Sequence, residues 1–145
     1  MAYWLVKSEP DVYSIDQLKK DKRTCWDGVR NYQARNLLRD SMKKGDIVLF
    51  YHSNCAEPGV TGIAKVVREG YPDNTNYKGK GNPDPANPTW FMVDIAFQRK
   101  LKRVITLAEI KAEGRLRDMQ LVQRGNRLSV MPVSAAEYEL LIGME

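Results

Sequence analysis

The sequence predicts an α+β fold, in which a mixed β-barrel of five or more strands has short helices packed around it. Strand-like and helix-like segments are interleaved unevenly along the chain, which argues against a regular βαβ series. The length of 145 residues and the 43% share of hydrophobic residues suit one core of ordinary size. We therefore expect residues 1–145 to form a single domain.

Five segments have strand character. Residues 3–7 are aromatic and β-branched, and this strand should end at Ser8-Glu9-Pro10, because the proline restricts Glu9 to extended geometry. In residues 90–98, large apolar side chains alternate with other residues at the two-residue period of a strand. The remaining strands are expected at residues 46–53, 60–67 and 128–133.

Three short helices are marked by capping signals. In each, Ser or Thr is followed three residues later by Glu or Gln, the spacing at which both side chains satisfy free backbone N–H groups. The pairs are Ser14 with Gln17, Thr106 with Glu109, and Ser134 with Glu137. These pairs predict helices near residues 14–21, 106–113 and 134–142.

A longer helix is expected to begin near Asn31 and to end before Gly45. It should bury the apolar residues that recur at three- and four-residue spacing, namely Ala34, Leu37, Leu38 and Met42. Residues 70–89 contain three glycines, four prolines and four asparagines. This composition predicts one long loop that contributes nothing to the core.

The charge is positive and unevenly distributed. The whole chain carries +5, whereas residues 99–127 alone hold nine basic and three acidic residues. A basic face toward a phosphate backbone and an ordinary solvated surface both explain this pattern. The basic candidates that lie closest together are Arg99, Lys100, Lys102 and Arg103.

Cys25 and Cys55 have neither the number nor the spacing of a disulfide framework. No apolar stretch follows a basic start, as a signal peptide requires, and no run approaches the length of a membrane span. We expect a monomer without a membrane partner in a reducing compartment, the cytoplasm, or the nucleus of a eukaryotic cell.

Enzyme signatures are mostly missing, and the sequence predicts neither a cofactor, a metal ion nor a catalytic residue. There is no phosphate-binding glycine loop, no dinucleotide fingerprint and no carboxylate cluster with metal spacing. The single histidine, His52, lies near Cys55 without an obvious orienting partner. A hydrolase that uses His52 with Glu9 or Asp27 stays an alternative, as does a module that binds a small metabolite.

Residues 26–36 are the most informative segment, because an aromatic ring and amide side chains stand beside arginines at a loop-to-helix junction. Trp26 precedes the turn dipeptide Asp27-Gly28, so its ring either stacks on a base or plugs the mouth of the barrel. Asn31 is either a helix cap or a reader of a base edge. Arg30 and Arg35 project from different sides of the helix.

Four blocks carry a family resemblance when taken together, in this order: residues 3–10, 26–36, 45–54 and 127–133. In these blocks the chain resembles the EVE domain family over residues 3–141. The resemblance implies a PUA-like β-barrel, related to the ASCH and YTH modules, with a pocket for a modified nucleobase of DNA or RNA. By matching positions, the pocket would draw on Lys7, Ser8, Trp26, Val29, Arg30, Asn31, His52, Ser53, Leu128 and Ser129.

The expected function is therefore a non-catalytic reader that holds an extruded or single-stranded base, such as methylated cytosine or adenine, against Trp26. Asn31, Ser8 and Ser53 are the candidates for hydrogen bonds to the base edge. Lys7 and Arg30 are the candidates for a nearby phosphate or an exocyclic oxygen. The nucleic-acid backbone is assigned to Arg35, Arg99, Lys100, Lys102, Arg103 and Arg127.

Two departures from the family pattern stand out. Residues 76–81 lack the further aromatic residues that relatives often carry there, so base contacts from this loop are in question. Met131 stands where glutamine is usual in the family, between Val130 and Pro132, and the sequence offers no interpretation of this change.

Overall fold

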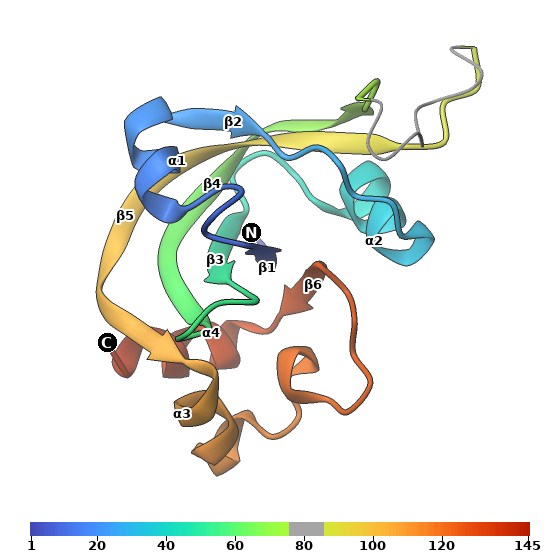
Figure 1. Ribbon diagram of the computed structural model, residues 1–145. Helices are drawn as coiled ribbons and strands as arrows, with labels where there is room; N and C mark the ends of the chain where they lie inside the picture. Colours follow the sequence, from blue (N-terminus) through green and yellow to red (C-terminus); the bar gives the residue numbers. More distant parts are fainter. Residues whose placement is uncertain (76–85) are drawn as a thin grey trace.

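The computed structural model describes residues 1–75 and 86–145 and has the expected α+β architecture (Figure 1). One mixed sheet has the strand order β2-β5-β4-β3-β1-β6. Its strands are β1 (Tyr3–Ser8), β2 (Arg23–Cys25), β3 (Ile47–His52), β4 (Gly59–Pro72), β5 (Phe91–Thr106) and β6 (Val130–Val133). The α-helices are α1 (Ile15–Asp21), α2 (Tyr32–Asn36), α3 (Leu107–Ala112) and α4 (Ala135–Gly143). Shorter helical turns are η1 (Leu37–Ser41), η3 (Gly114–Leu116) and η4 (Gln120–Val122).

The sheet curves strongly, but within the described residues it does not close into a full barrel. Its end strands, β2 and β6, are not paired with one another, and they are only three and four residues long. β1 and β3 run parallel, while every other neighbouring pair is antiparallel. The predicted fold class is confirmed, with a barrel-like open sheet in place of a closed one.

Curvature comes from the two long strands, β4 and β5. Their pairing shifts register four times, first between Val60 and Gly62, and each irregularity bends the pair and increases its twist. Gly62 also lets α1 pack directly on the sheet, because a Cβ at this position would overlap the side chain of Ile15. Residues far apart in the chain are thereby wrapped around one apolar core, which includes Leu5, Phe50 and Ile95.

Three helices follow their capping signals. Ser14 accepts a hydrogen bond from the backbone N–H of Gln17 at the start of α1. Complete capping boxes begin α3 at Thr106 and α4 at Ser134. No helix of the described residues is both long and apolar enough to span a membrane.

The predicted helix from Asn31 differs from the observed one. A short α2 passes into a wider π-helical turn, in which Met42 N–H donates to Leu37 O. Ala34, Leu38 and Met42 are buried as predicted, whereas Leu37 is only half-buried.

Two other predictions were wrong in extent. The strand expected at residues 90–98 continues to Thr106. Its second half was missed because charged residues on the solvent face hide the alternation of apolar residues. The loop expected at residues 70–89 begins later, since β4 reaches Pro72, and it does supply buried side chains, from Asp73 and from the adjoining Trp90. β2 was not predicted. Residues 76–81, where the family pattern was in question, lie within residues 76–85, outside the described part of the chain.

Candidate functional site

A cavity of roughly 570 Å³ opens where strand ends from distant parts of the sequence meet. Ser8 ends β1 and Ser53 follows β3, and these strands run parallel, so both serines lie at the same edge of the sheet. The backbone ties this edge together, since Ser53 N–H donates to Ser8 O over 3.0 Å. Lys7 N–H donates to Ser129 O over 2.9 Å and fastens the segment before β6. The cavity therefore has a floor fixed by sheet-like hydrogen bonds.

Trp26 forms the aromatic part of the wall. Its indole is 8% exposed and packs edge-to-face with Phe50, at a ring-centroid distance of 5.4 Å, and with Tyr13, at 6.3 Å. The indole is thus largely embedded, yet it borders the cavity. Its Nε1–H donates to none of the described residues, and the atom is not sealed from solvent. This donor is available to an acceptor within the cavity.

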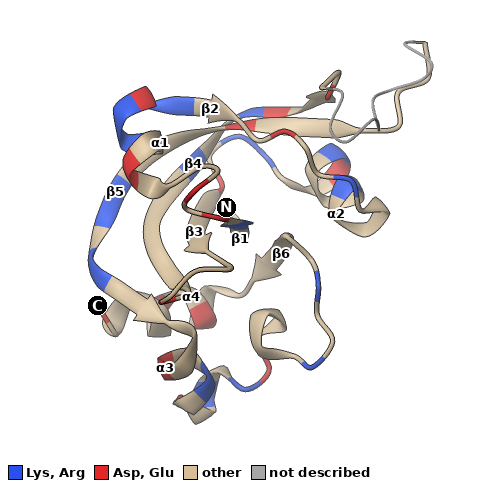
Figure 2. Cartoon of the chain, viewed as in Figure 1, with Lys and Arg blue, Asp and Glu red and all other residues tan. Residues whose placement is uncertain are grey.

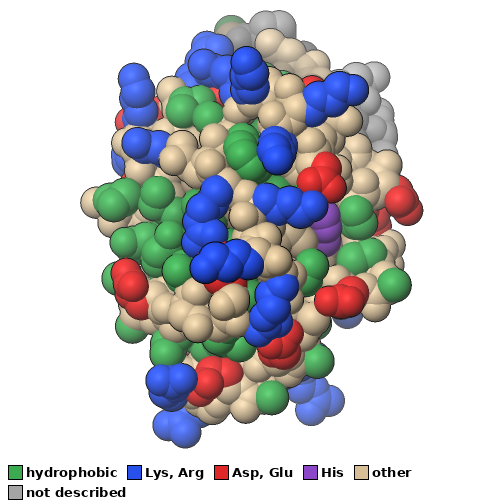
Figure 3. Space-filling view, turned by 90° about the vertical axis from the view of Figure 1, so that its left-hand side faces the viewer, with side chains coloured by type: hydrophobic (Ala, Val, Ile, Leu, Met, Phe, Trp, Pro, Cys, Tyr) green, Lys and Arg blue, Asp and Glu red, His purple; other side chains and the backbone are tan. Residues whose placement is uncertain are grey.

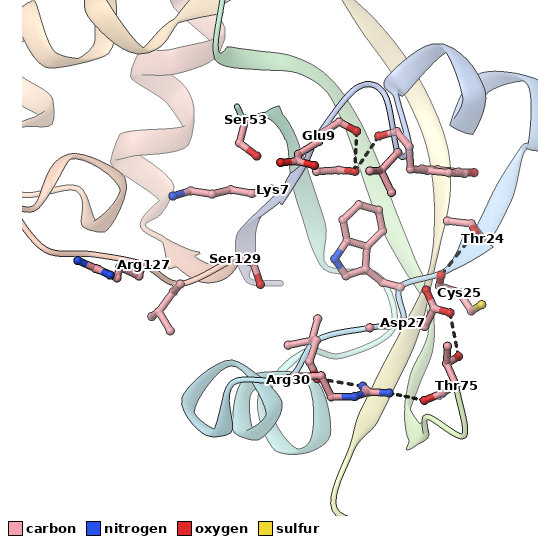
Figure 4. Close-up of a pocket in the computed structure, with 17 residues that line it drawn as sticks. Lys7, Glu9, Thr24, Cys25, Asp27, Arg30, Ser53, Thr75, Arg127 and Ser129 are labelled. Atoms are coloured by element: carbon pink, nitrogen blue, oxygen red, sulfur yellow. Dashed lines mark hydrogen bonds between the residues drawn. The ribbon is translucent and has the colours of Figure 1, made fainter. Parts of the chain in front are cut away.

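Charge is divided between the sides of the cavity (Figure 4). The cationic ends of Lys7 and Arg127 lie on one side, and the side chains of Cys25, Asp27 and Thr75 lie on the opposite side. Burial lowers the pKa of the Lys7 ammonium, which lies 5.8 Å from the centre of the Tyr51 ring and pairs with no described carboxylate. One side of the cavity is thus suited to an anionic group.

A buried ion pair holds the wall that carries Trp26. The Asp73 carboxylate is fully buried and accepts from Arg30 Nη1 over 2.9 Å, from Gly28 N–H over 2.8 Å and from Thr75 N–H over 2.9 Å. Burial alone would raise the pKa of Asp73, but the hydrogen bonds from Arg30, Gly28 and Thr75 outweigh it and lower the pKa below its usual value. Asp73 therefore fixes residues 26–30 at the cavity edge.

Most of the residues predicted for the pocket do border the cavity. They are Lys7, Ser8, Trp26, Val29, Arg30, Ser53, Leu128 and Ser129. Ser8 Oγ donates to Tyr13 O over 2.8 Å. With its proton engaged, this hydroxyl can only accept a hydrogen bond from a ligand. Arg30 requires a correction, because its side chain is 6% exposed and its guanidinium is bonded to Asp73 and to Thr75 O. Arg30 therefore supports the cavity wall, and its side chain points away from Lys7 and Arg127 and toward Thr75 (Figure 4).

Asn31 and His52 do not line the cavity. Asn31 Oδ1 caps α2 by accepting from Ala34 N–H over 3.0 Å, which was one of its two expected roles. His52 Nε2 accepts from Ile15 N–H over 3.1 Å and so serves the start of α1. Burial is the main reason that the pKa of His52 lies below its usual value. Their expected contacts with a base find no support in this geometry.

Several lining residues were not predicted for the base pocket, although Glu9 and Asp27 were named for the alternative hydrolase. Glu9 and Tyr13 come from the turn after β1, where Asn54 Nδ2 donates to Glu9 Oε1 over 2.6 Å. Asp27 and Thr75 lie opposite, joined by a hydrogen bond of 2.9 Å from Thr75 Oγ1. The proline after Glu9 marked the turn, but no sequence signal linked Thr75 to this wall.

The basic residues expected to meet the nucleic-acid backbone fall into two groups. Lys and Arg positions mark β5 in Figure 2, and Lys and Arg side chains gather on that side of the molecule in Figure 3. We call Arg99, Lys100, Lys102 and Arg103 the β5 basic group. Three of these side chains are ion-paired: Arg99 with Glu145, Lys100 with Asp16, and Arg103 with Glu109. None of the four lines the cavity.

The other group lies nearer the cavity. Arg127 lines it and is exposed. Arg35 does not line it, since Nη1 donates to Thr89 O over 2.7 Å and Nε donates to Asn36 Oδ1 over 2.8 Å. Within the described residues, no group of three or more His, Cys, Asp or Glu side chains is placed to hold a metal ion.

The curved mixed sheet, its outer helices and the cavity at the ends of β1 and β3 define a PUA-like α+β module. An ASCH protein from Zymomonas mobilis shares this fold at a TM-score of 0.57, with 10% identity and 99% of each chain covered. The model of the EVE domain matches residues 2–144, and the chain belongs to this family.

The relatives are similar over almost the entire chain. Human thymocyte nuclear protein 1 is 45% identical, with 99% of this chain and 74% of the relative covered. A crystal structure of a Pseudomonas syringae protein superposes with a TM-score of 0.92 at 44% identity, covering 99% of both chains. The human THYN1 protein, solved in complex with DNA that contains 5-methylcytosine, has a TM-score of 0.89 at 43% identity. That comparison covers 99% of this chain and 97% of the human one.

Proposed function

We propose that this chain is a non-catalytic nucleic-acid-binding module that holds a modified nucleobase, with methylated cytosine in DNA as the leading candidate. The observation that carries the proposal is the indole N–H of Trp26, which donates to none of the described residues, on the wall of a cavity that Lys7 and Arg127 also line. The human relative solved with DNA containing 5-methylcytosine supports the choice of partner.

The cavity has the size and the chemistry for one base. Its volume of roughly 570 Å³ falls within the range of about 300–1,000 Å³ for small-ligand sites. Val29 and Leu128 offer apolar contacts, while Ser53, Ser129 and the Trp26 N–H offer polar groups for a base edge. Lys7 and Arg127 are the candidates to bind the phosphate attached to the nucleotide whose base occupies the cavity.

Energetics limit what the cavity does alone. Extrusion of a base from a duplex costs a few kcal/mol, and stacking of a base on an aromatic ring returns about 1–3 kcal/mol. The remainder must come from contacts with the backbone of the nucleic acid. A single-stranded or mismatched site should therefore bind more tightly than a fully paired one.

Selectivity for a methyl group should be modest. Burial of one methyl group contributes about 0.8 kcal/mol, which is roughly a fourfold change in affinity. A larger preference requires that a methylated base also releases water from the cavity or improves the hydrogen bonds at its edge.

A binding panel tests the proposal. Short single- and double-stranded DNA and RNA, each with a plain, methylated or hydroxymethylated base, would be titrated at two salt concentrations. We expect binding to fall with salt and to be tighter for at least one modified base, with DNA preferred. Equal binding of all bases would refute the modified-base site, and salt-independent binding would favour a small metabolite. Release of any altered nucleotide during incubation would make the protein an enzyme.

A further inference from the structure

A second depression, of roughly 490 Å³, adjoins the cavity. We propose that it binds the sugar–phosphate of the nucleotide next to the one in the cavity, an inference that rests on the proposed function. Arg127 and Leu128 line both hollows. A strand whose base occupies the cavity would therefore pass over Arg127 into the depression.

The depression is chemically unlike the base cavity. Five amide side chains and two arginines line it, and no aspartate or glutamate of the described residues does. Amides donate and accept hydrogen bonds, so they suit the mixture of phosphate and sugar oxygens along a nucleic-acid chain. No aromatic ring of the described residues lines this hollow, which argues for the backbone as its occupant.

The two arginines, Arg124 and Arg127, are the charges that would hold phosphate. Both are exposed, and neither forms an ion pair with a described carboxylate. Other arginines of the same region are engaged, for example Arg103 with Glu109 at 2.7 Å and Arg115 with Glu113 at 2.9 Å. A guanidinium that is free of an internal carboxylate binds phosphate without first breaking a pair.

The loop that presents these arginines is already fixed by its own side chains. Gln123 Nε2 donates to Arg117 O over 2.7 Å and to Met119 O over 3.2 Å. Asn126 Oδ1 accepts from Leu128 N–H over 3.0 Å, and its Nδ2 donates to Gln120 O. Because these bonds exist before any ligand binds, little ordering entropy is lost on binding.

The test compares Arg124→Ala with Arg117→Ala in the full chain. Arg117 is an exposed arginine that is close in sequence to Arg124 and lines neither hollow. Its replacement by alanine therefore makes the same change in net charge away from the proposed subsite. The probes are a short single-stranded DNA with one central 5-methylcytosine, its unmethylated counterpart and the free nucleoside 5-methyl-2′-deoxycytidine. Affinity is measured across a series of salt concentrations.

For Arg124→Ala we expect about tenfold weaker binding of both DNA strands and a salt slope reduced by about 0.7, the value for one lost contact with single-stranded DNA. The ratio between methylated and plain DNA, and the affinity for the nucleoside, should stay as in the wild type. Arg117→Ala should change affinity less than twofold.

An unchanged salt slope in Arg124→Ala, or an equal loss in Arg117→Ala, would overturn the subsite. Failure of the base cavity looks different, because the wild type would then bind methylated and plain DNA equally while the effect of Arg124→Ala persisted. Arg124→Lys keeps the charge and removes the planar fork, and it should recover the slope but only part of the affinity.

Discussion

The buried Asp73 carboxylate is the point at which one substitution should most affect the site. In Asp73→Asn, Arg30 loses its ion pair while its side chain stays 6% exposed. Gly28 N–H and Arg30 Nη1 share one carboxylate oxygen, and Thr75 N–H uses the other. Whichever way the amide is turned, at least one of these donors then faces an NH₂ group.

Loss of one partner of a buried ion pair costs about 3–5 kcal/mol, and we expect Asp73→Asn to fall in that range. For a chain of this size, the midpoint of thermal unfolding should drop by roughly 6–20 °C. Urea denaturation at pH 7 gives the free energy directly. Asp40→Asn is the matched control, because its pair with Arg39 is 54% and 40% exposed and should contribute less than about 1 kcal/mol.

The pH dependence has a defined sign. The folded-state pKa of Asp73 lies below its usual 3.8, so the stability it contributes is present above that value and is lost as the pH falls through the folded-state pKa. The difference between wild type and Asp73→Asn should be full at pH 7 and shrink in strong acid. A difference below 1 kcal/mol at pH 7, or one that does not shrink in acid, would refute the assigned role.

Three further predictions concern binding. Trp26→Phe keeps a ring on the wall but removes the N–H. Because one hydrogen bond is lost, it should weaken binding of a modified oligonucleotide by about 1 kcal/mol. Equal affinity in a calorimetric titration would show that this donor does not contact the ligand. Lys7→Met should lower the salt slope by about 1. Because burial lowers the pKa of Lys7, wild-type affinity should decline with rising pH before an ordinary lysine would lose its proton, and the variant should lack this decline. Alanine at all four positions of the β5 basic group should flatten the salt slope and leave base preference unchanged, and an unchanged slope would mean that this group is only surface.

Local signals predicted the helices well, because a cap acts within three or four residues. Ser14, Thr106 and Ser134 each begin a helix as expected. The short strand β2 could not be predicted, since Arg23 and Thr24 carry no apolar alternation and the strand exists only because β5 is its neighbour. Pairing across long sequence distances was equally unpredictable for Asp73, because its partners Gly28 and Arg30 lie more than 40 residues earlier.

The lining of the cavity was predicted best for residues that the family resemblance assigned to strand ends. Lys7, Ser8 and Ser53 stand at the ends of two predicted strands, and the strands bring them together. Prediction was poorer where a side chain has a competing local partner. Asn31 is used by its own helix, the first of the two roles that its residue type suggested, whereas the use of His52 at the start of another helix was not predicted.

The parallel pairing of β1 with β3 determines where the chain tolerates insertions. The connection between these strands, residues 9–46, carries α1, β2, α2 and Trp26, so this one segment supplies much of the cavity wall while its two ends are held in the sheet. The entropic cost of lengthening such an excursion rises by only about 0.6 kcal/mol for each doubling. Insertions here could therefore remodel ligand preference while the scaffold is inherited unaltered.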